Sequence, residues 1–298
     1  METRKFGKTD MEFSVLGFGG VEIGWNNEAL ETVEELLNSA LDAGLNVIDT
    51  AAAYRTSEEL IGKAVGRRRK EYFLLTKCGS LDGFTREDWS KKGVLETIEQ
   101  SLRKLQTDYL DIAQLHSCSA EILRQGDCIE GLQRAREKGY TRYIGYSGDN
   151  EHAKYAIEMN VFDSLQTSVS IADQAAIDGN IPLAVERGLG IVAKRPIANA
   201  VWRHDSKPAD SYHHEYWERI QKLKFDFLDK SLAEATSNAL RFTMTIPGID
   251  TMIVGTTRPR RWEENARHVG KGNLSDEEFE AIRDRWREVA GDDWVQMT

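Results

Sequence analysis

The chain has 298 residues, of which 40% are hydrophobic and 30% charged, a composition typical of a globular protein rather than a disordered or fibrous one. Its 39 basic and 49 acidic residues give a formal net charge of −10. This charge argues against non-specific binding to nucleic acid or to anionic membranes, which needs a basic surface. It leaves room for a local basic pocket that binds an anionic cofactor.

The cysteines and the hydropathy profile indicate a reducing, aqueous environment. The three cysteines, Cys78, Cys118 and Cys128, form no CxxC pair, so we expect neither a disulfide framework nor a zinc site. No apolar run reaches about 18 residues, and the first residues lack the apolar core of a signal peptide. We therefore expect a cytoplasmic protein without a membrane span or a bound metal.

The pattern along the chain predicts one domain over residues 1–298, because no linker interrupts it. Helical patterns with apolar residues every three or four positions, such as 29–42, 93–105, 122–138 and 151–158, alternate with short apolar runs. Eight such runs are typical of a (β/α)8 TIM barrel, with an open doubly wound sheet as the alternative. The runs are 15–20, 46–50, 72–77, 109–116, 142–147, 164–170, 190–195 and 251–256.

Three further segments fall outside the eightfold pattern. Residues 5–14 resemble a β-hairpin that precedes the first strand and is placed to plug the barrel floor. Residues 198–242 are longer than one crossover and predict an extra loop and two helices. Residues 276–288 predict a terminal helix.

Two sequence motifs resemble known functional sites but do not meet the requirements of those sites. Residues 188–193 match the letters GxGxxA, but they precede a predicted strand instead of following one, so they do not form a Rossmann dinucleotide site. Residues 145–149 fall one residue short of a nucleophile elbow, which argues against a serine hydrolase.

Ionisable residues close three successive predicted strands. Asp49, Lys77 and His116 end strands 2, 3 and 4, and Tyr54 follows Asp49 by five residues. In an α/β barrel the carboxyl ends of the strands meet at one mouth, so we expect these four side chains to converge.

The residue types at this mouth suit proton delivery to an oxygen that becomes negative. A tyrosine phenol is a poor acid at neutral pH, and an ammonium beside it stabilises the phenolate and lowers its pKa. Lys77 can supply that charge, Asp49 can hold Lys77, and His116 can orient a substrate oxygen. None of these groups donates hydride, so carbonyl reduction here requires a cofactor.

At these residues the sequence resembles the aldo-keto reductase family over almost the whole chain. Five segments match in family order: 6–9 with 16–20, 46–54 (NVIDTAAAY), 74–77 (LLTK), 101–105 (SLRKL), and 108–111 (DYLD) with Leu115 and His116. The resemblance implies a catalytic tetrad of Asp49, Tyr54, Lys77 and His116. It also implies a (β/α)8 barrel that binds a nicotinamide dinucleotide across its mouth.

The resemblance further assigns residues to the cofactor's nicotinamide and pyrophosphate. Ser147 and Gln166 align with residues that hold the carboxamide. The family usually has asparagine where this chain has Gly148, and Asn150 is a candidate replacement. The remaining cofactor residues implied near the first and seventh strands are Gly19, Gly20, Lys194, Arg195, Pro196, Ile197 and Ala198. The charge of the adjacent Lys194 and Arg195 suits a phosphate.

Residues 253–265 resemble the family's adenosine-phosphate segment, with Thr256 expected to begin a helix whose N-terminus favours an anion. Arg261 aligns with the arginine for the 2′-phosphate, which implies NADPH rather than NADH. Many relatives have lysine at Gly255, a loss that Arg258, Arg260 or Lys194 could offset. The cofactor residues implied in this segment are Gly255, Thr256, Arg258, Arg261, Glu264 and Asn265.

The partner implied by the resemblance is a small-molecule carbonyl compound. Trp25, Trp89 and Trp202 are the candidate lining of its pocket, and Tyr212, Tyr216 and Trp217 in the 198–242 segment could line the pocket or stack on the cofactor. The sequence does not define the natural substrate, the direction of reaction or the oligomeric state.

Two other functions remain open at this stage. A Schiff-base aldolase would use Lys77 or Lys194 but leaves residues 258–265 without a role. A non-catalytic nicotinamide-binding regulatory module would explain Gly148 and Gly255, whereas retention of all four tetrad residues argues against it. Oxidation of Cys78 or Cys118 near the mouth is a further hypothesis.

Overall fold

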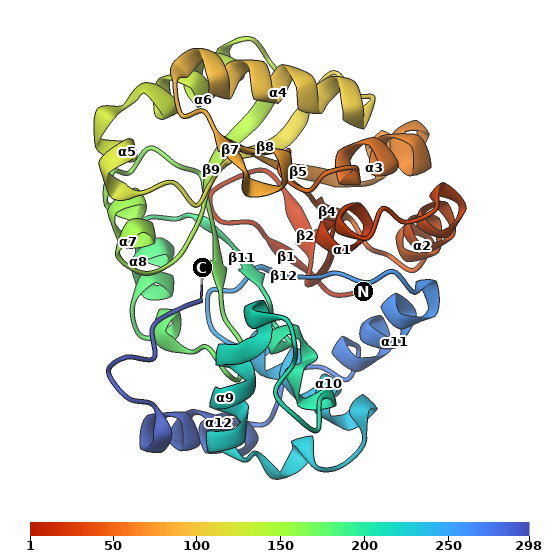
Figure 1. The fold of residues 1–298 in the computed structure, drawn as a ribbon, viewed down its shortest axis with the longest axis vertical. Helices are drawn as coiled ribbons and strands as arrows, with labels where there is room; N and C mark the ends of the chain where they lie inside the picture. The colour runs from red at the N-terminus through yellow and green to blue at the C-terminus, as the bar shows by residue number, and fades with distance from the viewer. Residues whose placement is uncertain (298) are drawn as a thin grey trace.

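A computed structural model describes residues 1–297, which form a closed barrel of eight parallel strands (Figure 1). Strand β12 pairs with β3 in parallel, so the sheet closes and the alternative of an open doubly wound sheet is wrong. The barrel strands are β3 (Leu16–Gly19), β4 (Val47–Asp49), β5 (Phe73–Cys78), β8 (Leu110–His116), β9 (Thr141–Ser147), β10 (Ser164–Ser168), β11 (Gly190–Lys194) and β12 (Thr251–Val254). Each coincides with one of the eight predicted runs to within one residue at β5 and β9 and lies inside the run elsewhere, which confirms the predicted (β/α)8 fold.

Helices surround the barrel because each one buries an apolar stripe against the strands. In α2, for example, Val33, Leu36 and Leu37 are fully buried. The helices are α1 (Val21–Trp25), α2 (Leu30–Asp42), α3 (Ser57–Val65), α4 (Lys91–Leu105), α5 (Ala120–Gln125), α6 (Asp127–Glu137), α7 (Asn150–Glu158), α8 (Asn180–Glu186), α9 (His214–Leu223), α10 (Leu232–Thr245), α11 (Pro259–Val269) and α12 (Asp276–Val289). No helix in the described part of the chain is both long and apolar enough to cross a membrane.

The predicted helix over 122–138 is two helices in the structure. Gly126 separates α5 from α6 with a φ of 89°, a left-handed conformation that a helix interior does not accept. Gly44 and Gly139 have positive φ values just after α2 and α6, as expected of glycines at helix C-termini.

The N-terminal hairpin closes the bottom of the barrel, as predicted. Its strands are β1 (Thr3–Lys5) and β2 (Glu12–Ser14), which pair antiparallel. Phe6 and Met11 in the connection between the strands, and Phe13 in β2, are fully buried. These side chains pack against residues inside the barrel, namely Val47, Leu75, Ile112, Val192 and Ile253. The hairpin therefore seals the end of the barrel opposite the strands' carboxyl ends.

The 198–242 segment contains two α-helices, as predicted. Helix α10 is the outer helix of the seventh unit, and α9 is additional. Helix α9 lies against α12 (Figure 1), and the Arg219 guanidinium of α9 faces the rings of Trp286 and Trp294. Beyond α12 the chain returns towards the ends of β9 and β10, where Asn150 hydrogen-bonds to Gln296.

A glutamate occupies the junction between the first and last barrel strands. Glu22, in the first turn of α1, lies over Gly255, which follows β12. Any side chain at residue 255 would collide with the Glu22 carboxylate. Oxygen Oε2 of Glu22 is buried without a hydrogen-bond partner among residues 1–297, and burial raises the pKa of Glu22 to about 7.

Glu22→Gln should stabilise the protein at pH 8 but not at pH 4. The folded protein must ionise Glu22 against its raised pKa, so this residue progressively costs stability as the pH rises from about 4.5 to about 7. Glutamine does not ionise and avoids the cost. We expect the Tm of the variant to exceed that of the parent by about 5 °C at pH 8. Equal Tm values at both pH values, measured by circular dichroism, would contradict the burial of an unpaired carboxylate.

Candidate active site

The four predicted catalytic residues lie at the carboxyl ends of three adjacent strands. Asp49 ends β4, Lys77 is the penultimate residue of β5, and His116 ends β8. Tyr54 follows β4 in the loop before α3. Strands β4, β5 and β8 are neighbours in the barrel, so the structure brings these side chains together.

A buried ion pair joins two of the strands. Lys77 Nζ lies 2.6 Å from Asp49 Oδ2 and donates a second hydrogen bond of 2.9 Å to the carbonyl oxygen of Thr50. The side chains of Lys77 and Asp49 are only 2% and 1% exposed, so water does not screen the pair. Burial alone would lower the pKa of Lys77, but Asp49 raises it above its usual value, so Lys77 remains charged at neutral pH.

Tyr54 faces this charge. Lys77 Nζ lies 5.0 Å from the centre of the Tyr54 ring. Burial raises the pKa of Tyr54 above its usual value, and the Lys77 charge opposes this rise without cancelling it. The expectation of a lowered phenol pKa is therefore wrong for the protein on its own, because the phenolate is desolvated. Tyr54 is a protonated phenol at neutral pH, as a proton donor must be.

His116 is a neutral imidazole beside Tyr54. Burial, and then the positive charges of Lys77 and Lys194, hold the pKa of His116 well below its usual value. Its ring is 5.5 Å from that of Tyr54 and nearly perpendicular to it. The buried Nδ1 has no hydrogen-bond partner within residues 1–297. A neutral imidazole still has one N–H to donate, which suits the orientation of a substrate oxygen.

An aromatic side chain that sequence analysis missed covers these residues. Phe84, in the turn between β6 (Ser80–Leu81) and β7 (Arg86–Glu87), lies 5.0 Å from the His116 ring and 6.2 Å from the Tyr54 ring. Its side chain is half exposed and also approaches Trp25 at 6.3 Å. The one signal in the sequence was a large apolar residue beside Gly83, in a segment too short to be recognised as a hairpin.

The three predicted pocket tryptophans have different surroundings. Trp25 joins the aromatic group through Phe84. Trp89 packs directly over Gly79, and its Nε1 donates to Glu87. Trp202 lines a cavity of about 310 Å³ with residues of α9 and of the segment after it, a set that includes none of the tetrad. Only Trp25 is linked to the tetrad by these contacts.

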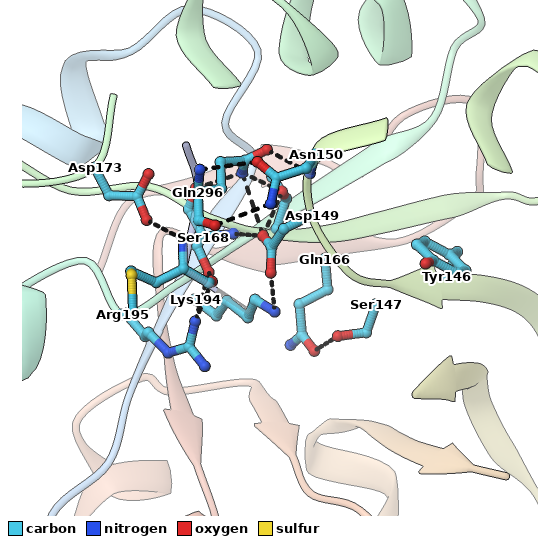
Figure 2. Close-up of polar contacts among 12 residues, drawn as sticks. Tyr146, Ser147, Asp149, Asn150, Gln166, Ser168, Asp173, Lys194, Arg195 and Gln296 are labelled. Carbon is cyan, nitrogen blue, oxygen red and sulfur yellow. Dashed lines mark hydrogen bonds and ion pairs between the residues drawn. The ribbon is translucent and has the colours of Figure 1, made fainter. Parts of the chain in front are cut away.

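Ser147, which ends β9, and Gln166, within β10, form a polar pair (Figure 2). The Ser147 hydroxyl donates to Gln166 Oε1 at 2.8 Å. Gln166 Nε2 is buried and lacks a hydrogen-bond partner in the described part of the chain. Such an orphaned donor fits a carbonyl oxygen of a bound carboxamide.

Asn150 is not available for this role. Its side chain donates to the carbonyl oxygen of Gln296 at 2.9 Å and accepts from the backbone N–H of Gln296 at 2.8 Å. Gly148 has no side chain because a Cβ there would come within 2.6 Å of the Tyr146 ring. The expected replacement of the family's asparagine by Asn150 is therefore wrong.

The basic residues after β11 already have partners within the protein. Lys194 Nζ pairs with Asp149 Oδ2 at 2.7 Å (Figure 2). Arg195 donates to the hydroxyls of Ser168 and Tyr212, both at 2.8 Å. Lys194 and Arg195 are thus fixed side by side at the edge of the mouth, and residues 196–198 follow them. The Asp149 carboxylate balances the charge of Lys194 and fixes its position.

Two of the six predicted adenosine-phosphate residues line a second opening. Arg261 and Glu264, which form an ion pair of 2.8 Å, line a cavity of about 410 Å³ together with Leu232, Ala233, Arg267 and His268. Asn265 is buried nearby on α11, and its Oδ1 lacks a partner among the described residues. These groups can hold an adenosine with an anionic group beside it.

The backbone between β12 and α11 differs from the predicted one. Helix α11 begins at Pro259, with Arg258 before it, so the expectation that Thr256 starts the helix is wrong. The Thr256 hydroxyl instead accepts from the Arg258 N–H at 3.1 Å.

A Cβ at Gly19 would contact the Gly255 backbone at 3.5 Å, so the β3 and β12 ends approach closely. Gly20 donates its N–H to Asp49 O at 2.8 Å.

Comparison with known proteins identifies relatives of the whole chain. The chain is 28% identical to the uncharacterized oxidoreductase YqkF of Bacillus subtilis, over 95% of this chain and 96% of that protein. It is 24% identical to the NADH-specific methylglyoxal reductase of Escherichia coli, over 95% and 98%. The holo form of aldo-keto reductase AKR11C1 from Bacillus halodurans, 25% identical, superimposes with a TM-score of 0.85 over 99% of each chain. The model of the Aldo/keto reductase family matches residues 15–287, and the chain belongs to this family of oxidoreductases.

Proposed function

We propose that the protein reduces the carbonyl group of a small aldehyde or ketone to an alcohol, with NADPH as the reductant. The observation that carries this proposal is the convergence of a protonated Tyr54, a charged Lys77 held by Asp49, and a neutral His116 at one barrel mouth. Membership of an oxidoreductase family that uses nicotinamide cofactors supports the proposal.

The chain's own residues account for the proton in this reaction. A reduced nicotinamide, when bound at this mouth, would supply the hydride that the carbonyl carbon requires. Tyr54 gives its phenolic proton to the carbonyl oxygen as that oxygen gains charge, so a neutral alcohol forms. Lys77 stabilises the phenolate that remains on Tyr54, and Asp49 keeps Lys77 charged and in position. His116 donates a hydrogen bond to the same oxygen and orients it.

The polar pair of Ser147 and Gln166 fits the other reactant. Gln166 Nε2 is a buried donor without a partner in the described chain, and it lies within the barrel mouth that also holds the tetrad. A carboxamide held there would have a fixed ring orientation, which places the reacting carbon relative to Tyr54. The aromatic rings of Phe84 and Trp25 offer an apolar wall for the carbonyl compound.

The preference for NADPH rests on the basic residues around the second cavity. Arg261 lines that cavity and provides the planar guanidinium that suits a 2′-phosphate. The Glu22 carboxylate occupies the space above Gly255, where many relatives have a lysine. The E. coli relative is named as NADH-specific, which makes the nucleotide preference of this chain the first property to measure.

The two other functions have less support. A Schiff base on Lys77 needs a neutral amine, whereas the Asp49 ion pair keeps this amine protonated. Lys194 has a pKa lowered by burial, but it is paired with Asp149. A purely regulatory nicotinamide-binding module does not require the arrangement of Tyr54 against Lys77.

Tyr54→Phe should slow the reaction strongly while leaving cofactor binding intact. Removal of a positioned acid costs at least about 100-fold in kcat. The assay is NADPH oxidation against a panel of aldehydes and ketones, with NADPH affinity measured by quenching of tryptophan fluorescence. Tyr140→Phe, whose hydroxyl lies beside Lys138, is the matched control and should retain parental activity. Equal activity of Tyr54→Phe and the parent would rule out the proposed role.

Arg261→Ala should weaken the binding of NADPH much more than that of NADH. Loss of a charged hydrogen-bond partner costs about 10- to 100-fold in affinity for the phosphorylated nucleotide. The NADH Kd should change by less than about 3-fold, because only the 2′-phosphate distinguishes the two ligands. Arg287→Ala, an exposed change on α12, serves as the control. An equal loss of affinity for both nucleotides would remove Arg261 as the determinant of NADPH preference.

A further inference from the structure

The segment that follows α12 enters the barrel mouth. Helix α12 ends at Val289, and Trp294 packs edge-on against Trp286 at 5.0 Å between ring centres. From there the chain reaches the ends of β9 and β10, where Gln296 is only 3% exposed (Figure 2). A residue far away in the sequence thus becomes part of the region around Ser147 and Gln166.

The Gln296 side chain bridges two strand ends. Its Nε2 donates to Thr167 Oγ1 at 2.7 Å, to the carbonyl oxygen of Ser168 at 2.8 Å and to Asp149 Oδ1 at 3.2 Å. Its Oε1 accepts from the backbone N–H of Asn150 at 3.0 Å. The residues it contacts directly follow Ser147 and Gln166, so Gln296 fixes the geometry of the strand ends that carry this polar pair.

Gln296 also orients the carboxylate that balances Lys194. Asp149 Oδ1 accepts from Gln296, from Thr167 Oγ1 and from the Ser168 N–H, while Oδ2 pairs with Lys194 at 2.7 Å. Asp149 is fully buried, so its position depends on these few bonds. The Lys194 ammonium in turn contributes to the low pKa of His116.

The next residue holds the basic loop after β11. The Met297 carbonyl oxygen accepts from the Ser168 hydroxyl at 2.7 Å and from Arg195 Nη1. The Met297 N–H donates to Asp173 Oδ2 at 3.0 Å. Arg195 has a left-handed backbone conformation with a φ of 57°. Three residues shortly after it are also left-handed, with φ values of 44° at Ala198, 54° at Asn199 and 50° at Ala200. Non-glycine residues keep such conformations only where surrounding contacts enforce them.

We propose that Gln296 is a positioning residue for nicotinamide-cofactor binding: with Met297 it holds Asp149, Lys194 and Arg195 in the arrangement that receives the nicotinamide and pyrophosphate. This inference rests on the proposed function, because it concerns the same site. The contacts of Gln296 and Met297 described above pre-organise the strand ends and the loop after β11, and pre-organisation increases affinity by lowering the cost of ordering on binding.

The test is the isosteric variant Gln296→Glu. Glutamate keeps the oxygen that accepts from the Asn150 N–H. It replaces the donor Nε2 with a second oxygen, which faces the Asp149 carboxylate and the Ser168 carbonyl oxygen. We expect the NADPH Kd, measured by tryptophan fluorescence quenching at 25 °C, to rise at least about 10-fold. The KM for the carbonyl compound should change by less than about 3-fold, because the tetrad lies on strands that Gln296 does not contact.

Two further variants distinguish positioning from a loss of folding. Val295→Ala changes an exposed side chain in the same segment and should keep the parental Kd. Ser168→Ala removes the hydroxyl that donates to the Met297 carbonyl oxygen and accepts from Arg195, and should raise the Kd about 3-fold or more. Circular dichroism gives the Tm of each variant.

The outcomes separate the inference from the proposed function. A parent protein that binds neither NADPH nor NADH overturns both. A parent that binds, together with Gln296→Glu and Ser168→Ala variants that bind equally tightly, overturns the inference alone. A lowered Tm with an unchanged Kd would show a role in stability only, and it also contradicts the inference.

Discussion

The buried ion pair between Lys77 and Asp49 is the interaction on which the site depends. Two charges withdrawn from water are costly unless their remaining hydrogen-bonding capacity is also satisfied. Here Lys77 also donates to the Thr50 carbonyl oxygen, and the Gln114 amide reaches Asp49 Oδ1 at 3.4 Å. Neighbouring strands of a closed barrel hold both partners in register, so the pair needs no rearrangement to act.

The rest of the mouth is arranged around this fixed charge. Burial, together with the charges of Lys77 and Lys194, lowers the pKa of His116 and keeps its imidazole neutral. Each lysine has its own buried carboxylate. Tyr54 keeps its proton because burial outweighs the attraction of Lys77 for the phenolate. A charged Lys77, a neutral His116 and a Tyr54 that keeps its proton therefore surround the place of a substrate oxygen. The apolar hairpin beneath the barrel supports this arrangement without contributing to its chemistry.

The sequence was sufficient for the barrel and for the convergence of the tetrad, since both depend on short-range patterns and on the rule that strand ends meet. It was insufficient wherever distant segments meet. Gln296 reaches Asp149 across the chain, and Phe84 reaches His116 from a short hairpin. The pairing of Lys194 with Asp149, and of Asn150 with Gln296, likewise depended on tertiary placement. The balance between desolvation and charge at Tyr54 required the burial of the phenol to be known.

The most direct test of this account is the pH dependence of the chemical step in Asp49→Asn, measured as single-turnover oxidation of NADPH with the best carbonyl compound. Asp49 raises the pKa of Lys77 against the effect of burial, so without it the amine loses its proton at a lower pH. The account predicts a parental rate that is nearly constant between about pH 6 and pH 8. The variant should be at least about 10-fold slower at the higher pH than at the lower, because the neutral amine no longer stabilises the Tyr54 phenolate. A folded variant whose profile runs parallel to that of the parent would contradict the claim that Asp49 maintains the charge of Lys77.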